Sequence, residues 1–196
     1  MKKILITWES KWIWKFLKDN LLKNYQIFWF SRSNWFDLTK KETFKKIKEV
    51  IWSEKLNFLI LNAWVGEFGK FEEIDLEKLE NIINLNLLAN IRLLKYLQDN
   101  ITKETKIIFI WSIISKKFMK EASVYQASKF WLRWLAWWLK QEWKKVFLIN
   151  PKIVDTDFHK GKIELDRKLP ETKLEDILEV INNIILGKEK RFEIDL

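Results

Sequence analysis

Short apolar segments alternate with amphipathic segments from one end of this 196-residue chain to the other. The apolar segments lie at residues 3–7, 26–30, 57–61, 106–110 and 145–149, and a shorter candidate strand lies at 191–195. Their apolar residues are consecutive instead of alternating, which predicts strands that are covered on both faces. Strands that alternate with helices indicate a doubly wound parallel sheet in a three-layer α/β/α arrangement.

Apolar residues at helical spacing fill the intervals between these strands. We expect helices at residues 11–24, 40–51, 75–100, 122–143 and 173–186, with Asp75 capping the longest of them. No repeat, low-complexity linker or break in composition divides the chain. The sequence therefore predicts a single domain over residues 1–196.

The composition excludes several classes of protein. The chain has no Cys and a single His, His159, which excludes a disulfide scaffold and leads us to expect no metal site. The sequence contains no run of about 18 apolar residues, so we expect no membrane span. It also shows no charged and apolar leader, so we expect a cytoplasmic protein. The net charge of +9 comes from Lys spread over every segment, so we expect no nucleic-acid partner.

One feature of the composition is unusual, because the chain has 13 Trp and only 4 Gly. Gly normally makes up about 7% of a protein, so most of the expected glycines are missing. The ratio suggests that Trp stands at positions where Gly belongs.

Three of these Trp residues follow the first expected strand. The segment reads Thr7-Trp8-Glu9-Ser10-Lys11-Trp12-Ile13-Trp14, and with Gly at the three Trp positions it becomes TGESKGIG. In a dinucleotide-binding turn the first Gly allows a tight turn, the second lets the backbone approach a pyrophosphate, and the third lets the helix pack on the strand. The segment also lies at the carboxyl end of a strand, where parallel sheets bind their ligands.

With Gly at these positions, the segment resembles the glycine-rich turn of the short-chain dehydrogenase/reductase family. The resemblance continues on later loops, in the family's order, at Asn62-Ala63-Trp64, Asn86-Leu87-Leu88-Ala89, Ser112, Tyr125-Gln126-Ala127-Ser128-Lys129 and Pro151-Lys152-Ile153-Val154-Asp155-Thr156. Lys152 departs from the family pattern, which has Gly there. The resemblance implies a Rossmann-like fold and an oxidoreductase that transfers a hydride between NADP(H) and a small carbonyl or alcohol substrate, acting on a CH–OH group.

Four residues carry the implied chemistry. Tyr125 and Lys129 are four residues apart and share a helix face, so we expect the ammonium to lower the pKa of the phenol toward working pH. The resemblance implies that Tyr125 is the general acid or base and that Ser112 orients the substrate oxygen. It also implies that Lys129 holds the nicotinamide ribose and that Asn86 holds a proton-relay water.

The choice of NADP(H) over NAD(H) depends on two basic residues. Arg32 follows the second strand, where an acidic residue would bind the ribose 2′-hydroxyl of NAD and a basic one accommodates a 2′-phosphate. Lys11 has the same meaning in the family, and Asp37 and Leu38 resemble the pair beside adenine. The other implied cofactor contacts are Thr7, Trp8, Ser10, Trp12, Ile13, Trp14, Asn62, Ala63, Trp64, Tyr125, Lys129, Pro151, Val154 and Thr156.

Two explanations of the Trp residues stay open. Either they are real, and the protein is a catalytically dead family member that binds or regulates with its cofactor site filled. Or their codons are UGA, which some bacterial lineages read as Gly and a common alternative code reads as Trp. The stripe Trp131, Trp134 and Trp138 has helical spacing and predicts a core face or the contact of a homodimer or homotetramer.

Overall fold

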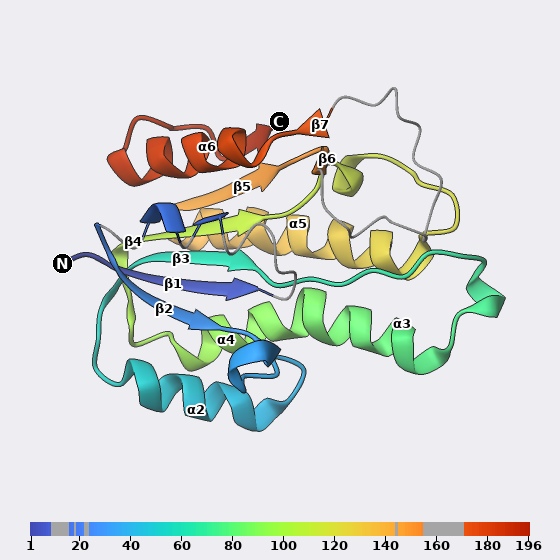
Figure 1. Cartoon of the computed structure of the whole chain (residues 1–196), viewed down its shortest axis with the longest axis horizontal. Coiled ribbons are helices and arrows are strands. Elements are labelled where there is room, and N and C mark those ends of the chain that lie inside the picture. The colour runs from blue at the N-terminus through green and yellow to red at the C-terminus, as the bar shows by residue number, and fades with distance from the viewer. Residues whose placement is uncertain (9–15, 18, 22–23, 144, 155–170) are drawn as a thin grey trace.

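The chain folds around a six-stranded parallel sheet in the order β2-β1-β3-β4-β5-β8, as a computed structural model describes for residues 1–8, 16–17, 19–21, 24–143, 145–154 and 171–196. The strands are β1 (Lys3–Trp8), β2 (Gln26–Phe30), β3 (Leu56–Asn62), β4 (Ile101–Ile110), β5 (Val146–Asn150) and β8 (Glu193–Asp195). Every neighbouring pair is parallel, so the carboxyl ends meet at one edge (Figure 1). The prediction of a doubly wound parallel sheet is confirmed.

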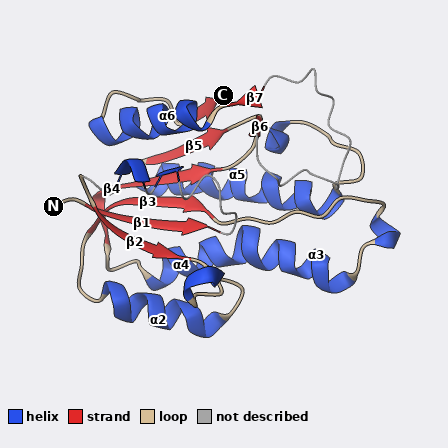
Figure 2. Ribbon diagram, viewed as in Figure 1, coloured by secondary structure: helices blue, strands red, loops and turns tan. Residues whose placement is uncertain are grey.

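Three helices cover one face of the sheet. They are α2 (Lys41–Ile51), α4 (Ala89–Tyr96) and α5 (Ser123–Trp143); in Figure 2, α2 and α4 lie below the strands and α5 runs behind them. One buried cluster joins their apolar residues to those of the strands, and it includes Phe44 of α2 and Leu132 of α5. The amphipathic spacing of the sequence therefore places a continuous apolar stripe of each helix on the sheet.

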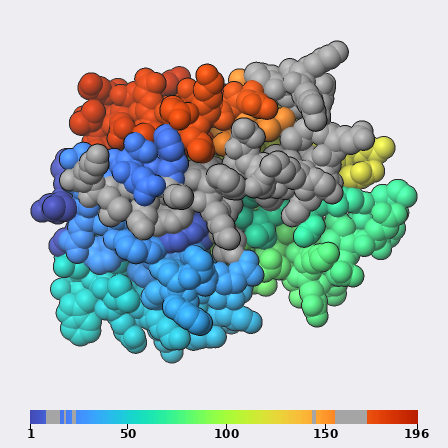
Figure 3. Space-filling view, viewed as in Figure 1, coloured from blue at the N-terminus to red at the C-terminus, as the bar shows by residue number. Residues whose placement is uncertain are grey.

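The opposite face packs against α6 (Leu174–Leu186). Ile177 and Ile181 of this helix share a buried cluster with strand residues and with Leu17 and Leu21, which are helical. In the space-filling view, α6 and α2 occupy opposite margins of the molecule (Figure 3). Helices thus lie on both faces, and the predicted three-layer arrangement is confirmed.

The helix expected over residues 75–100 is interrupted in the structure. It consists of α3 (Leu76–Ile83), a π-helical turn (Asn84–Leu88) and α4, which ends four residues before the expected end. A π-helical turn inserts one residue into the helix and shifts the faces on either side of it, and such turns are frequent at functional sites. The apolar spacing alone did not reveal this turn, because one inserted residue hardly changes the pattern over a window of several turns.

The direction in which the sheet grows reverses between β1 and β3. From β1 the chain first adds β2 on one side and then β3, β4, β5 and β8 on the other. The usual order of dinucleotide-binding domains is 3-2-1-4-5-6, so the described sheet has one strand fewer beside β2. Ligands of such sheets bind outside the carboxyl ends at the reversal, which here lies beyond Trp8 and Asn62.

A second, two-stranded parallel sheet was not expected from the sequence. It pairs β6 (Ile153–Val154) with β7 (Glu171–Thr172), and Lys152 adds a hydrogen bond from its backbone amide to the Thr172 hydroxyl at 2.9 Å. Strands of two residues are too short to leave a periodic signal in a sequence.

None of the described helices is long and apolar enough to cross a membrane, and the described residues hold no cluster of three potential metal ligands.

Candidate active site

Ser112 and Tyr125 meet at the carboxyl edge of the sheet. Ser112 follows β4 and begins a short 3-10 helix, η4 (Ile113–Lys116), whereas Tyr125 lies in the first turn of α5. Their side chains are hydrogen-bonded to each other. Lys129 lies one turn further along α5, with its Nζ 5.1 Å from the centre of the Tyr125 ring. The structure therefore brings together three of the four predicted catalytic residues.

Asn86, the fourth, lies in the π-helical turn and connects two other segments. Its side-chain oxygen accepts a hydrogen bond from the Val65 amide at 2.8 Å, and its side-chain nitrogen donates to the Val65 carbonyl at 2.9 Å and to the Ser128 hydroxyl at 2.9 Å. The Ser128 hydroxyl in turn donates to the Tyr125 carbonyl at 2.6 Å. Asn86 therefore holds the loop after β3 against the first turns of α5, and its role toward a water stays a prediction.

The ammonium group of Lys129 is buried between two indole rings. The residue is fully buried, and its Nζ lies 3.7 Å from the ring centre of Trp111 and 4.3 Å from that of Trp64. No hydrogen-bond partner for this Nζ is found among the described residues. Burial holds the pKa of Lys129 well below its ordinary value, because no carboxylate offsets the loss of water.

The expected lowering of the Tyr125 pKa is wrong for this structure. Burial raises the pKa of Tyr125 well above its ordinary value, and the hydrogen bond with Ser112 offsets this only in part. The rings of Phe68 and Trp64, at 5.3 and 6.3 Å between centres, cover the phenol ring and exclude water. Lys129 does not restore the phenolate, because the same burial favours its own neutral form.

Two buried polar side chains at this edge fit a polar ligand. Asn62, at the end of β3, is 1% exposed, and neither polar atom of its side chain has a hydrogen-bond partner among the described residues. Its backbone amide donates to the Thr7 hydroxyl at 3.3 Å, which ties the ends of β3 and β1 together. Buried polar groups are almost always hydrogen-bonded, so Asn62 and Lys129 both call for a partner from outside the described residues.

The indoles at this edge do not fit a dinucleotide. Trp8 ends β1 and is 5% exposed, and Trp64 and Trp111 enclose the Lys129 ammonium. Trp111 also donates from its indole nitrogen to the Lys129 carbonyl at 2.8 Å, so the ring is fixed in place. A Trp side chain buries roughly 150–250 Å², so three of them at this edge fill space beside the buried polar groups. The polar groups therefore fit a dinucleotide, but the tryptophans of the present sequence do not.

The residues predicted beside the adenosine follow β2. Arg32 is exposed and begins a short 3-10 helix, η1 (Arg32–Asn34). Asp37 accepts hydrogen bonds from the Thr39 amide at 2.9 Å and the Thr39 hydroxyl at 2.7 Å. Burial alone would raise the pKa of Asp37, but these hydrogen bonds and the charge of Arg32 outweigh it and lower the pKa. Leu38 is buried in the main core cluster.

The remaining predicted contacts fall into two groups. Ala63 and Pro151 are buried and Val154 is half-buried in β6, all near the carboxyl edge. Lys152 does not have a positive φ, so its backbone does not need the Gly that the family pattern has there. Outside the described residues lie Ser10, Lys11, Trp12, Ile13, Trp14 and Thr156.

The sequence did not identify the residues that surround Tyr125 and the ion pairs that join α5 to the C-terminal strand. Val65 and Phe68 follow the Asn-Ala motif, but only their position after β3 distinguishes them from other apolar residues. Glu193 and Asp195 are two residues apart on a strand and so share one face. This spacing could have indicated a pair of carboxylates on the last strand of the sheet.

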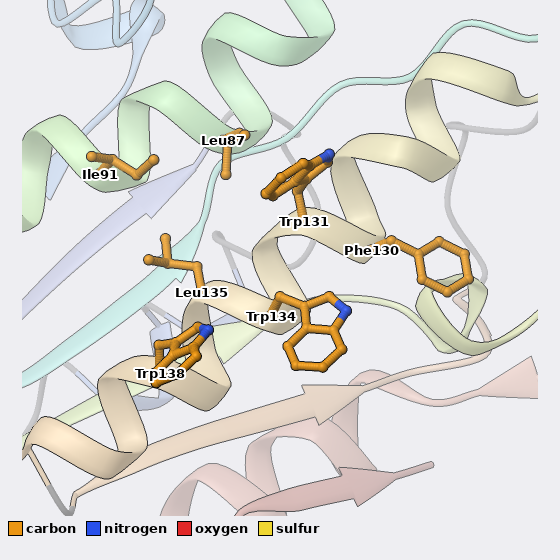
Figure 4. Close-up of a pocket in the computed structure, with 7 residues that line it drawn as sticks. All are labelled: Leu87, Ile91, Phe130, Trp131, Trp134, Leu135 and Trp138. Atoms are coloured by element: carbon orange, nitrogen blue, oxygen red, sulfur yellow. The ribbon is translucent and has the colours of Figure 1, made fainter.

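An apolar groove lies along the exposed tryptophans of α5, and none of the predicted catalytic residues lines it (Figure 4). Its volume is about 690 Å³, and its lining comes from α5 and from the segment before and within α4: Leu87, Ile91, Phe130, Trp131, Trp134, Leu135 and Trp138. The predicted tryptophan stripe is therefore an exposed face and not part of the core. Its use as a contact between subunits stays a prediction.

The chain belongs to the short-chain dehydrogenase family of oxidoreductases. The sequence profile of the family, described as short chain dehydrogenase, matches residues 32–166, which is well over half of the chain. This match contains the loop of Asn62, the π-helical turn, Ser112 and the helix with Tyr125 and Lys129. No curated protein sequence matched the chain at a significant level.

Solved structures of this family share the fold. A short chain dehydrogenase family protein from Francisella tularensis subsp. tularensis SCHU S4 has a TM-score of 0.85 at 20% identity, over 100% of this chain and 97% of that chain. A 3-ketoacyl-(acyl-carrier-protein) reductase from Brucella melitensis, complexed with NADH, has a TM-score of 0.87 at 17% identity, over 100% and 96%. An alcohol dehydrogenase from Thermococcus sibiricus, complexed with 5-hydroxy-NADP, has a TM-score of 0.73 at 21% identity, over 100% and 96%. The Rossmann-like fold predicted from the sequence is confirmed.

Proposed function

We propose that the protein is an NADP(H)-dependent oxidoreductase that reduces a small carbonyl compound or oxidises the corresponding alcohol. The observation that carries the proposal is the hydrogen-bonded pair of Ser112 and Tyr125 beside the buried Nζ of Lys129. These three groups come from two segments and meet at the carboxyl edge of the sheet, where such folds bind ligands. Neighbours of the same fold are complexed with NADH and with 5-hydroxy-NADP, which supports a nicotinamide dinucleotide as the cofactor.

Each residue has a defined task in this proposal. In the reducing direction, the Tyr125 hydroxyl donates its proton to the substrate oxygen, and the Ser112 hydroxyl donates a hydrogen bond to the same oxygen. Lys129 donates hydrogen bonds to the ribose hydroxyls of the cofactor and stabilises the phenolate that remains. When bound, the nicotinamide supplies the hydride. Arg32, exposed directly after β2, supports the 2′-phosphate of NADP(H) over the 2′-hydroxyl of NAD(H).

We further propose that the natural residue is Gly at the Trp positions of this sequence. Trp35 has φ 71° and ψ 13°, and Trp52 has φ 48° and ψ −120°; only three non-glycine residues of the described chain have a positive φ, and these are two of them. A left-handed backbone costs a bulky residue about 1–3 kcal/mol, whereas Gly adopts it freely. The side chains are 93% and 75% exposed, so little packing offsets that cost.

The same replacement accounts for the conflict at the active site. Gly at positions 8, 64 and 111 removes the indoles that end β1 and enclose Lys129, and leaves Asn62 and Lys129 facing open space. We call the chain with Gly at all thirteen Trp positions the glycine form, and the chain with the present sequence the tryptophan form. The alternative is a catalytically dead family member, which the burial of Tyr125 and Lys129 in the tryptophan form favours, since it raises the pKa of Tyr125 and lowers that of Lys129.

The test begins with the gene and then uses both forms. UGA at codons 8, 64 and 111 supports the glycine form, and UGG there removes the basis for it. The glycine form is then titrated with NADPH by fluorescence and assayed with simple aldehydes and ketones. The absence of any NADPH response in a folded glycine form would contradict the enzymatic proposal. We also propose a single domain over residues 1–196 that forms a homodimer or homotetramer, which sedimentation experiments test. A cytoplasmic location is likewise a proposal, which a localisation experiment tests.

A further inference from the structure

Two carboxylates on the C-terminal strand bind side chains from three other elements. Glu193 accepts hydrogen bonds from Nε of Arg133 at 2.8 Å and from a terminal nitrogen of its guanidinium at 3.0 Å. Lys116 lies 3.1 Å from the Glu193 carboxylate and 2.7 Å from that of Asp195. The Asn150 side-chain nitrogen donates to both carboxylates, at 2.8 and 2.9 Å. We call Glu193 and Asp195 the carboxylate clamp.

The clamp joins the two segments that carry the catalytic groups. Arg133 is one helical turn beyond Lys129 and two turns beyond Tyr125 on α5, so the three side chains lie along the same face of the helix. Lys116 ends η4, four residues after Ser112. Glu193 contacts both basic side chains at once, and it therefore fixes the distance between the helix of Tyr125 and the loop of Ser112.

Contacts from α5 also hold the loop with Ser112, because the Gln126 side chain donates to the Lys117 carbonyl and accepts from the Met119 amide, and Ile114 packs against the cluster of Tyr125. The helix η4 has four residues, and its first amide, that of Ile113, donates to the Pro151 carbonyl at 3.0 Å. The Ser112 hydroxyl accepts a long hydrogen bond of 3.3 Å from the Ile114 amide. A single 3-10 turn gains little stability from its own hydrogen bonds, so contacts from outside the turn determine where it lies.

The electrostatics of Glu193 agree with this bridging role. Burial alone would raise the pKa of Glu193, but hydrogen bonds from Arg133, Lys116 and Asn150 outweigh it and bring the pKa down to about 2. The Glu193 side chain is 15% exposed, so the pair with Arg133 is screened less than a surface ion pair. The Glu193 carboxylate is therefore charged at neutral pH.

A second carboxylate near the C-terminus provides a matched comparison. Hydrogen bonds from the side chain and backbone of Arg191 bring the pKa of Glu189 to about 2 as well. The Glu189 carboxylate accepts hydrogen bonds from Lys190 and Arg191, which lie within two residues of it in the chain, and its backbone amide donates to the Asn183 carbonyl at 3.1 Å. Glu189 thus has an equally perturbed pKa but bridges no distant elements.

We propose that Glu193 is a positioning residue that holds the Ser112 hydroxyl against Tyr125 by binding Lys116 and Arg133 simultaneously. The inference rests on the proposed function, since it assigns Ser112 and Tyr125 their catalytic roles. Glu193 touches neither group itself and acts through the placement of η4 relative to α5. A displacement of about 1 Å at a catalytic group lowers turnover by about 100-fold, so a moderate loosening has a measurable effect.

The kinetic test uses Glu193→Gln, with Glu189→Gln as the control, in the full-length glycine form. We expect Glu193→Gln to lower kcat by about 10–100-fold with less than a threefold change in the KM for NADPH, and Glu189→Gln to change neither. A double-mutant cycle separates positioning from general weakening. In a Ser112→Ala background, Glu193→Gln then lowers kcat by less than about threefold, because the group that it positions is gone. Independent effects that multiply in the double variant would overturn the proposal.

A second measurement does not depend on turnover. Hydrogen exchange of the unliganded protein follows the amides of Ile113 and Ser115, which donate to the Pro151 and Ser112 carbonyls. We expect Glu193→Gln to accelerate their exchange by at least about tenfold and to leave the amides of α2 unchanged. Unchanged exchange at Ile113 and Ser115 would overturn the clamp, even in an active enzyme. A parent glycine form without turnover would instead count against the proposed function, so the two failures are distinguishable.

Discussion

Lys129 and Arg133 lie one turn apart on α5 and have opposite surroundings. Lys129 is fully buried between two indoles, its Nζ has no hydrogen-bond partner among the described residues, and burial lowers its pKa. Arg133 forms a two-bond pair with Glu193, and these hydrogen bonds raise its pKa. The same helix thus holds one basic side chain, Arg133, with hydrogen-bond acceptors in the fold, and one, Lys129, with no acceptor for its Nζ among the described residues.

The difference suggests different roles for the two side chains. Arg133 stabilises the fold, whereas we propose that a ligand supplies the hydrogen-bond acceptors of Lys129. Burying an unpaired charge is costly, so a fold leaves a buried cation without a partner only where something else supplies one. Arg133 already has two protein acceptors and connects α5 to β8. Among the described residues, the Lys129 Nζ has no acceptor, and neither polar atom of the Asn62 side chain has a hydrogen-bond partner. These two groups belong to the carboxyl edge of the sheet, where we propose that the dinucleotide binds.

The largest expected effect comes from removing the indoles around Lys129. We expect the glycine form to bind NADPH at least about 10³-fold more tightly than the tryptophan form, a difference of about 4 kcal/mol, because Gly at 8, 64 and 111 frees the space beside Lys129 and Asn62. Fluorescence titration measures both affinities. The control replaces only Trp131 and Trp134 on the exposed face of α5, and leaves the affinity of the tryptophan form unchanged. Tight binding of NADPH by the tryptophan form would show that the indoles do not fill the site.

The second largest effect concerns the chemistry beside Lys129. In the glycine form, Tyr125→Phe should lower kcat by about 10²–10⁴-fold, because it removes the proton donor and keeps the ring. The affinity for NADPH should change by less than about twofold, since Phe fills the same space between Phe68 and position 64. Steady-state kinetics and fluorescence titration give the two values. Nearly full turnover in this variant would mean that a group other than Tyr125 is the general acid or base.

The comparison also predicts stability changes of opposite sign in the tryptophan form. Lys129→Met should raise the free energy of unfolding by about 1–2 kcal/mol, because Met fills the space between the indoles without a buried amine that lacks a hydrogen-bond partner among the described residues. Arg133→Met should lower it by about 1–3 kcal/mol, because it breaks two hydrogen bonds to a charged acceptor. Urea denaturation at pH 7 measures both. If the two variants change stability in the same direction, the distinction between the two cations is wrong.

The fold was more predictable from the sequence than the state of the site. Five continuous apolar runs determined the positions of most strands, because a strand covered on both faces must be apolar at consecutive positions. The motif spacing also indicated that Ser112, Tyr125 and Lys129 would meet. It did not indicate that burial would raise the pKa of Tyr125, since that depends on the rings of Trp64 and Phe68, which arrive from a different loop.

Other features left no periodic signal in the sequence. The π-helical turn that holds Asn86 is a single-residue insertion, and β6 and β7 are two residues long. The positive φ values of Trp35 and Trp52 depend on how η1 and α2 end, so they required the structure. The excess of Trp over Gly raised the question, and the backbone at these two residues supports the same answer independently of any motif.

The smallest expected effect is the pH dependence of the clamp beside Arg133. The pKa of Glu193 is about 2 in the folded protein and about 4.5 in the unfolded chain, so the unfolded chain takes up its proton first as the pH falls. The stability that Glu193 contributes is therefore fully present above about pH 4.5 and is lost as the pH falls to about 2. Glu193→Gln should lower the free energy of unfolding by about 1–2 kcal/mol at pH 7 and by progressively less below pH 4.5. Thermal unfolding at several pH values measures this, and a deficit that stays constant down to pH 2 would mean that the glutamine costs packing and not charge.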